Sequence, residues 1–298
     1  MMSLRTWRTI CAASLVACGA AASHATEILV PAYFYPSSNP AQSLWPAMTA
    51  ALAQGAHVTA IMNPGNGPGP AANSDYSAAV DAFRAAGGRV LGYVYTCYGG
   101  TQCAASQPAT RTTADVLADV QHYADWYHVD GVFLDEMSNR NADLPFYATI
   151  STSLRAAHAG WQIVGNPGTA TPAEYLAVAD TLVTFEGAGD SYAASAPLPW
   201  MGSADPARHA HLFYNASGTA SMQSLLAQAV ARHAGYGYIT DDRYTPNNPA
   251  EPNPWDQLPT YFTAEAAAVA AVPEVPAVWL SLAGLAALGL RIRSTSKR

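Results

Sequence analysis

The sequence repeats one pattern eight times within residues 27–271. A short β-rich run ends in a polar residue, a loop rich in Pro, Gly and Asn follows, and an Ala-rich amphipathic segment completes the unit. Alternation of this kind is typical of parallel βα units. The expected strands cover residues 28–35, 57–63, 89–96, 129–135, 161–166, 180–186, 209–215 and 235–240. Eight units in about 246 residues predict an α/β fold, a single-domain (β/α)8 TIM barrel.

A doubly wound open sheet is the alternative, and it requires a glycine-rich phosphate loop after an early strand. The candidate is residues 63–70, NPGNGPGP, which lack the G-x-G-x-x-G spacing and contain three prolines. Prolines have no backbone N–H with which to bind phosphate. We therefore interpret this segment as a rigid loop at the mouth of a barrel.

Residues 1–25 are typical of a signal peptide. Arg5 and Arg8 precede an apolar run over residues 10–17, and Ser23-His24-Ala25 fits a signal-peptidase site. The sequence around Cys18 also resembles a lipoprotein cleavage site, which is the alternative. Export is the prediction in either case.

Residues 272–298 resemble a PEP-CTERM sorting signal of Gram-negative bacteria. Pro273-Glu274-Val275-Pro276 leads into an apolar run that ends at Leu290, and four basic residues follow it. An ordinary membrane anchor is the alternative, and only this tail is expected to contact a membrane. The resemblance implies that export and tail-processing machinery are partners. It places the protein in the periplasm, on the outer surface or in the extracellular matrix.

Charge and cysteine content restrict the possible partners of the core. Between the two ends the chain holds 8 arginines and 20 acidic residues, so nucleic acid is a poor candidate partner. Cys97 and Cys103 lie in a glycine-rich loop of a chain predicted to be exported, and a disulfide between them is the expectation. A metal site is the weaker interpretation, because no further Cys or His follows at ligand spacing.

Nearly every predicted strand ends in a group that can hydrogen-bond a polyol. Aromatic residues suited to stacking on sugar faces lie between or after the strands: Tyr33, Trp45, Tyr93, Tyr98, Trp200, Tyr214, Tyr244 and Trp255. From both sets we predict substrate contacts by Tyr35, Asn63, Tyr95, Asn166, Trp200, Asn215 and Asp241.

Two carboxyl groups that flank one bond are the requirement for sugar hydrolysis. Asp135 and Glu136 end the fourth predicted strand, and Glu186 ends the sixth. Strand pleating sends neighbouring side chains to opposite sides, so one of Asp135 and Glu136 is expected to face the barrel mouth and the other to support it. The plainer alternative is that Asp135 and Glu136 cap a helix.

Other chemistries have weaker support. His209 and His211 look like a metal-binding pair, but they stand at the start of a strand, opposite the expected site. There is no G-x-S-x-G elbow, and the only lysine is Lys297 in the tail. Neither a metal nor a cofactor is expected.

Several motifs resemble the spherulin-4-like family: PAYFYP at 31–36, NPGNGPG at 63–69, GYVYT at 92–96, YADWYHVDGVFLDE at 123–136 and FEG at 185–187. The resemblance implies a (β/α)8 glycoside hydrolase that cuts galactosamine-containing exopolysaccharides such as galactosaminogalactan. It also implies that the essential acids are Asp135, Glu136 and Glu186. The loop with Cys97 and Cys103 does not align with the family pattern.

The resulting hypothesis is an exported, endo-acting glycoside hydrolase. Asp135 is the nucleophile or water-orienting group, Glu186 is the general acid/base, and Glu136 supports both. The distance between the carboxyl groups decides between retention and inversion. A non-catalytic polysaccharide-binding barrel and a metal-dependent hydrolase are the rivals.

Overall fold

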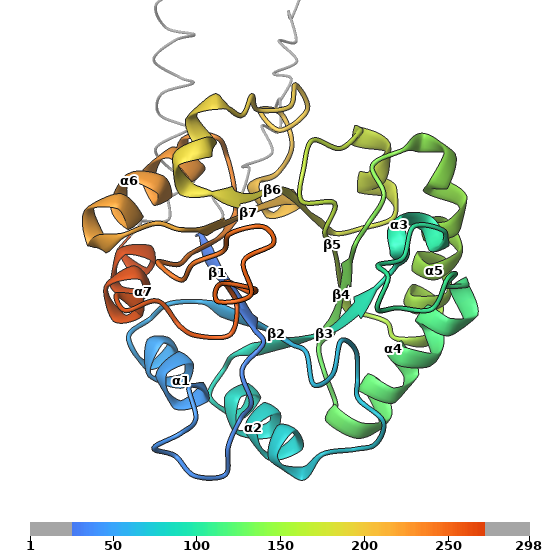
Figure 1. Ribbon diagram of the computed structural model, residues 1–298, viewed down its shortest axis with the longest axis horizontal. Coiled ribbons are helices and arrows are strands. Elements are labelled where there is room, and N and C mark those ends of the chain that lie inside the picture. The colour runs from blue at the N-terminus through green and yellow to red at the C-terminus, as the bar shows by residue number, and fades with distance from the viewer. Residues whose placement is uncertain (1–25, 272–298) are drawn as a thin grey trace, which may run out of the picture. The chain divides into compact units, whose positions relative to one another are not determined.

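The computed structural model describes residues 26–271, which form a closed barrel of eight parallel strands (Figure 1). Neighbours in the chain are neighbours in the barrel, and β1 closes it by pairing with β8 through Glu27 and Tyr236. The predicted (β/α)8 barrel is thereby confirmed. The strands are β1 (Glu27–Ala32), β2 (Val58–Met62), β3 (Arg89–Tyr95), β4 (Gly131–Asp135), β5 (Gln162–Gly165), β6 (Thr181–Ala188), β7 (His209–Tyr214) and β8 (Tyr236–Ile239).

Helices surround the barrel (Figure 1). They are α1 (Trp45–Ala53), α2 (Ser74–Ala85), α4 (Thr113–Tyr127), α5 (Leu144–Ala157), α6 (Gly218–Ala231) and α7 (Phe262–Ala270), with one short turn, α3 (Cys97–Gly100). Four 3₁₀ segments complete the described part of the chain: η1 (Asn141–Asp143), η2 (Ala173–Ala177), η3 (Gly189–Ala194) and η4 (Pro206–Arg208). The amphipathic segment expected after the fifth predicted strand forms only the 3₁₀ segment η2.

Two helices begin where the sequence provides side-chain caps. Oδ1 of Asn73 accepts hydrogen bonds from the backbone N–H groups of Asp75 and Tyr76 at the start of α2. Thr112 and Asp115 form a capping box at the start of α4. Such caps satisfy backbone donors that have no partner inside the helix.

The core lies inside the barrel and between the barrel and its helices. Every residue of β2 and β5 is buried, as expected for strands covered on both faces. Gly92 in β3 allows α4 to approach closely, because a Cβ at this position would lie 2.5 Å from the ring of Tyr123. The ring of Tyr123 therefore occupies the space that a side chain at position 92 would need.

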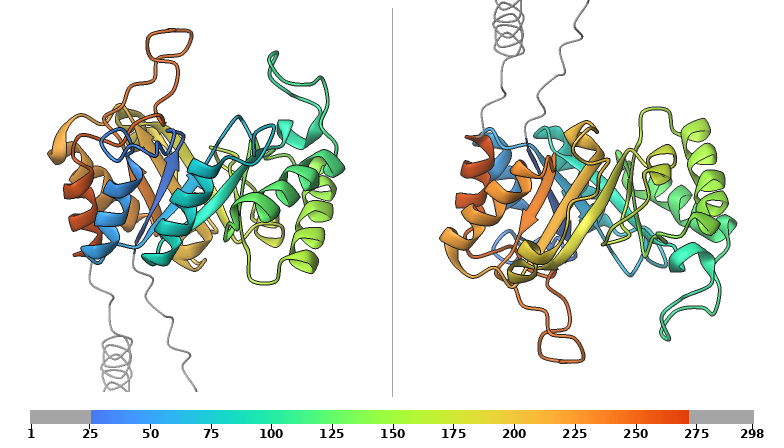
Figure 2. Two further views of the ribbon diagram at one scale, coloured as in Figure 1. Left: turned by 90° about the horizontal axis from the view of Figure 1, so that it is seen from below. Right: turned by 90° about the horizontal axis from the view of Figure 1, so that it is seen from above.

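Two long loops project from the barrel on the same side, one over residues 101–110 and one over residues 241–255 (Figure 2). The first follows β3 and the second follows β8, so both lie at the C-terminal ends of the strands. This is the end at which barrels of this kind carry their functional residues.

Among residues 26–271, no helix is both long enough and apolar enough to cross a membrane. The predicted signal peptide and sorting signal lie outside the described residues.

Candidate functional site

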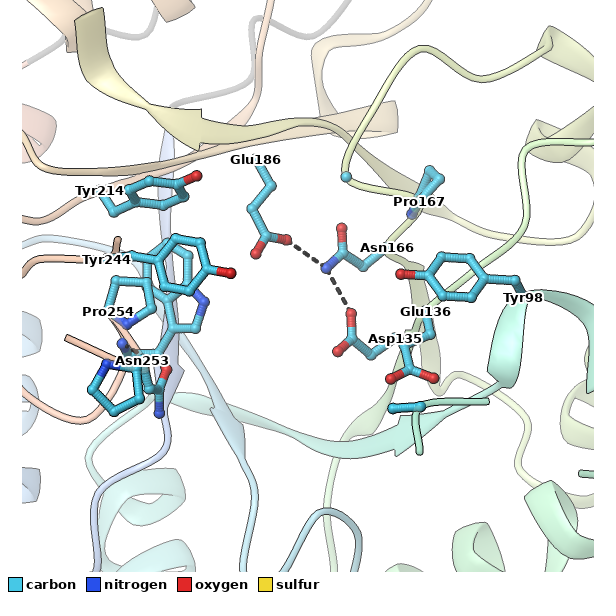
Figure 3. Close-up of a pocket in the computed structure, with 14 residues that line it drawn as sticks. Tyr98, Asp135, Glu136, Asn166, Pro167, Glu186, Tyr214, Tyr244, Asn253 and Pro254 are labelled. Atoms are coloured by element: carbon cyan, nitrogen blue, oxygen red, sulfur yellow. Dashed lines mark hydrogen bonds between the residues drawn. The ribbon is translucent and has the colours of Figure 1, made fainter. Parts of the chain in front are cut away.

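Three adjacent strands bring Asp135, Asn166 and Glu186 together. β4 ends at Asp135, Asn166 directly follows β5, and Glu186 lies near the end of β6. Nδ2 of Asn166 donates to Oδ1 of Asp135 and to Oε2 of Glu186, each at 2.7 Å (Figure 3). Two such bonds from one nitrogen keep the two acceptor oxygens within about 5.4 Å of each other. The carboxylates that the sequence places 51 positions apart therefore face each other across one amide.

Burial dominates the electrostatics of this pair. It raises the pKa of Glu186 to about 7, and the charge of Asp135 acts in the same direction. Burial also raises the pKa of Asp135, against the opposing effect of hydrogen bonds from Tyr93, the Glu136 backbone and Asn166. The site can therefore hold a proton near neutral pH, which is the range required of a general acid.

Glu136 leaves the strand in a left-handed backbone conformation, with a φ of +49°. This conformation is uncommon for a residue with a side chain. It breaks the alternation of the strand, so Asp135 and Glu136 both line the same pocket. The expectation that only one of them would face the mouth rested on regular pleating, which ends at Asp135.

The three carboxylates line a pocket of about 720 Å³. Tyr98 lies on the side of Asp135 and Glu136, and Tyr214 and Tyr244 lie on the opposite side of the pocket (Figure 3). Trp255 and Gly168 also line it, and no Arg or Lys does so among the described residues. The pocket combines acidic groups with aromatic surfaces, a composition suited to a neutral or cationic polyol.

Two further tyrosines lie beneath the carboxylates. Tyr33 follows β1 and Tyr93 lies in β3, and their rings meet edge to face at 5.5 Å. Burial raises the pKa of Tyr33 well above its usual range, and the charges of Asp135 and Glu186 add to the effect. Both phenols therefore remain protonated beside the acids.

The expected disulfide between Cys97 and Cys103 is present, with 4.4 Å between the two Cα atoms. It closes the start of the loop over residues 101–110, next to the pocket residue Tyr98. The loop that does not align with the family pattern thus belongs to the site.

Of the seven predicted substrate contacts, Asn166 lines the pocket. The side chains of Tyr35, Asn63 and Tyr95 have partners elsewhere. The hydroxyl of Tyr35 donates to Asp75 at 2.7 Å, Oδ1 of Asn63 accepts from the N–H of Gly67, and the ring of Tyr95 lies under the guanidinium of Arg111. As substrate contacts, these three stay predictions.

Trp200, Asn215 and Asp241 also lie outside the residues that line this pocket. The indole of Trp200 donates to the carbonyl of Thr171, and Asp241 accepts from the backbone N–H of Thr260. Asn215 binds the backbone of Tyr244 twice, accepting from its N–H at 2.9 Å and donating to its carbonyl at 3.0 Å. Asn215 therefore holds a pocket residue in place. Direct sugar contacts by all three stay predictions.

Gln107 is a site residue that the sequence did not indicate. Its Nε2 donates to Oε1 of Glu136 at 2.9 Å. It lies in an irregular loop with no periodicity and no motif, so no short-range signal marks it. Asn253 and Pro254, which also line the pocket, were missed for the same reason.

Both histidines are buried in β7. His209 opens the strand, but His211 pairs with Phe185, next to Glu186, so the expectation that both lie opposite the site is wrong for His211. Tyr192 and Thr184 bind the two ring nitrogens of His211, at 2.7 Å and 3.1 Å. Burial lowers the pKa of His209 to about 4 and that of His211 to about 3, so both are neutral. Within residues 26–271, no three His, Cys, Asp or Glu side chains gather so as to hold a metal ion.

Known proteins resemble this chain in both sequence and fold. The model of the spherulation-specific family 4 matches residues 27–269. This chain belongs to that family. Spherulin-4 of Physarum polycephalum is 30% identical over 269 residues, which cover 85% of this chain and 73% of that protein.

A solved structure from a second organism shares the fold of this chain. Sph3 of Aspergillus clavatus, solved in complex with GalNAc, has a TM-score of 0.65 and 20% sequence identity. The match covers 83% of this chain and 98% of that one. The similarity extends over nearly the whole barrel.

Proposed function

We propose that this protein is an exported, endo-acting glycoside hydrolase that cuts an exopolysaccharide containing galactosamine or N-acetylgalactosamine. The observation that carries the proposal is the Asn166 bridge, which holds Oδ1 of Asp135 and Oε2 of Glu186 within about 5.4 Å of each other. Two facing carboxyl groups in a pocket with aromatic walls are what glycosidic hydrolysis needs. Membership of the family and the fold shared with a GalNAc-binding protein support the substrate class.

The roles of the carboxylates follow from their surroundings. Glu186, with a pKa of about 7, protonates the leaving oxygen and later removes a proton from water. Asp135 attacks the anomeric carbon, and Glu136 supports the sugar from the same edge. Separations of about 5 to 5.5 Å are typical of retaining enzymes, and about 6.5 to 9.5 Å of inverting ones. The upper bound of about 5.4 Å between the two bridged oxygens supports retention.

Export is part of the proposal. The disulfide between Cys97 and Cys103 is the kind of bond that persists outside the cytoplasm. Secretion, tail processing and the final location at the Gram-negative surface can be followed by fractionating cells that express the full chain. Tagged protein found only in the cytoplasm would contradict this part.

The test of hydrolysis compares wild type, Glu186→Gln and Glu174→Gln on purified galactosaminogalactan. Glu174 is exposed in η2 and serves as the matched control. We expect new reducing ends from wild type and from Glu174→Gln, and a loss of at least about 1,000-fold in Glu186→Gln. Wild-type binding of the polymer without new reducing ends would instead identify a polysaccharide-binding barrel. Proton NMR of the first product tests retention.

A further inference from the structure

The loop closed by the Cys97–Cys103 disulfide contributes residues to the pocket wall, in addition to those at the strand ends. Cys97 is fully buried and bonded to the half-buried Cys103. Tyr98, next to Cys97, lines the pocket, as does Ala104, next to Cys103. The bond therefore joins two points of the pocket wall.

The backbone around this bond is held in a disfavoured conformation. Cys97 and Tyr98 have φ values of +50° and +49°, and Gly99 and Gly100 continue the left-handed run. Residues with side chains adopt such angles only where surrounding contacts impose them. The backbone N–H of Tyr98 donates to the carbonyl of Glu136 at 2.7 Å, which ties the strained turn to the acidic edge.

The same loop fixes the side chain of Glu136 through Gln107. Oε1 of Gln107 accepts from the N–H of Ala104 at 2.9 Å, while its Nε2 donates to Oε1 of Glu136. The other oxygen of Glu136, Oε2, is buried and has no hydrogen-bond partner among residues 26–271. Gln107 thus leaves one carboxylate oxygen free for a donor on a bound ligand, such as a sugar hydroxyl or amide.

We propose that the Cys97–Cys103 disulfide controls sugar affinity at this site by holding Gln107 against Glu136 and Tyr98 at the pocket wall. This proposal takes the identity of the sugar from the proposed function and does not require that the sugar be hydrolysed. Gln107 acts as a positioning residue through Glu136. Reduction by a dithiol transfers two electrons and two protons, yields two cysteine thiols and converts the dithiol into a cyclic disulfide. The loop then loses its covalent closure, and the left-handed turn relaxes.

The test measures the dissociation constant for N-acetylgalactosamine by calorimetry, with and without dithiothreitol. It uses wild type, Gln107→Ala, Ser106→Ala and the double variant Cys97→Ser/Cys103→Ser. Ser106 is the exposed neighbour of Gln107 and the matched control. We expect the reduction of wild type to weaken binding about tenfold, the effect of losing one hydrogen bond to a charged group. Gln107→Ala and the double variant should each show the same loss without dithiothreitol.

Ser106→Ala should bind as wild type, and the double variant should not respond to dithiothreitol. In a Glu136→Ala background, Gln107→Ala should cause no further loss, because both act through one contact. Three results would overturn the inference. The first is unchanged affinity in reduced wild type whose loop thiols are shown to be free. The others are equal binding by Gln107→Ala and Ser106→Ala, and no sugar binding at all. A redox-dependent affinity without any release of reducing ends would support it while contradicting the proposed hydrolysis.

Discussion

Asp135 and Glu186 share a single hydrogen-bond donor, Nδ2 of Asn166, at 2.7 Å from each. Two carboxylates this close cannot both be ionised easily, and the shared donor favours the charged form of each. Asn166 therefore opposes the rise in pKa that burial causes in both acids. Its other amide atom, Oδ1, is buried without a partner among the described residues. The side-chain hydrogen bonds of Asn166 in this part of the chain are therefore the two to Asp135 and Glu186.

Replacing Asn166 with Ala should lower kcat/KM by at least roughly 100-fold. The change removes two hydrogen bonds to charged groups, each of which contributes about 1.5 to 3 kcal/mol. Initial rates on galactosaminogalactan measure the effect. Asn39→Ala, at an exposed position in the loop before α1, is the control and should keep wild-type activity. Activity of Asn166→Ala within a factor of two of wild type would remove the bridge from the mechanism.

The pH profile of the wild-type rate should fall on its alkaline side near pH 7. Glu186 has a pKa of about 7 and must carry a proton to act as general acid, so activity declines as the pH rises through that value. The hydrogen bond from Asn166 lowers this pKa, so Asn166→Ala should shift the alkaline limb to higher pH. Residual rates between pH 5 and 9 measure the shift. A limb that stays fixed in the variant would mean that another group sets it.

The fold was predictable because each βα unit contains its own signals. The apolar runs, the Pro- and Gly-rich loops and the amphipathic segments are all local, and eight such units are the number that a (β/α)8 barrel contains. Asp135, Asn166 and Glu186 were predictable for the same reason, since the C-terminal ends of parallel strands converge. The position of these three residues at one end of the barrel can be inferred without knowing the conformation of any loop.

The surroundings of the acids were less predictable because they depend on loops and on distant partners. Tyr35 lies at a strand end, yet its hydroxyl binds Asp75, forty positions away. Asn215 supports the backbone of Tyr244 from another loop. Gln107 reaches Glu136 only because the disulfide and a left-handed turn direct the chain there. None of these contacts leaves a periodic trace in the sequence.

Tyr244 and Tyr35 provide a direct comparison between the pocket wall and a strand-end position outside it. Tyr244 lines the pocket and packs edge to face on Tyr214 at 5.4 Å. Tyr244→Ala should raise KM several-fold with little change in kcat, because it removes stacking surface and leaves the acids intact. Tyr35→Ala should change KM by less than twofold. Steady-state kinetics separate the two, and a larger effect at Tyr35 would support the substrate contact that the sequence predicts.

Asn215→Ala should reproduce the KM effect of Tyr244→Ala. Asn215 accepts from the backbone N–H of Tyr244 and donates to its carbonyl, so its loss releases the loop that carries the ring. If the two act through one contact, the double variant should be no worse than either single variant. Additive losses would indicate that Asn215 contacts the sugar itself, as the sequence suggested.

The stability of the barrel should decrease as the pH rises above 5, because of a carboxyl group remote from the catalytic pair. Glu265 in α7 is 1% exposed, and its Oε1 accepts from the backbone N–H of Ile239 in β8. Burial raises the pKa of Glu265 to about 8, and the charge of Asp241 adds to the shift. The unfolded chain releases this proton near pH 4.3, so between the two pKa values the folded state binds more protons.

This proton linkage makes the free energy of unfolding fall with rising pH, by up to about 1.4 kcal/mol per pH unit from Glu265 alone. Stability from this group is complete below about pH 4.3 and is lost as the pH rises toward the folded pKa of about 8. Glu265→Gln keeps an acceptor for Ile239 but cannot ionise, so its stability should depend less on pH. Urea unfolding at pH 5, 6.5 and 8 measures the difference. Equal pH slopes in Glu265→Gln and wild type would show that Glu265 is charged in the folded protein at neutral pH.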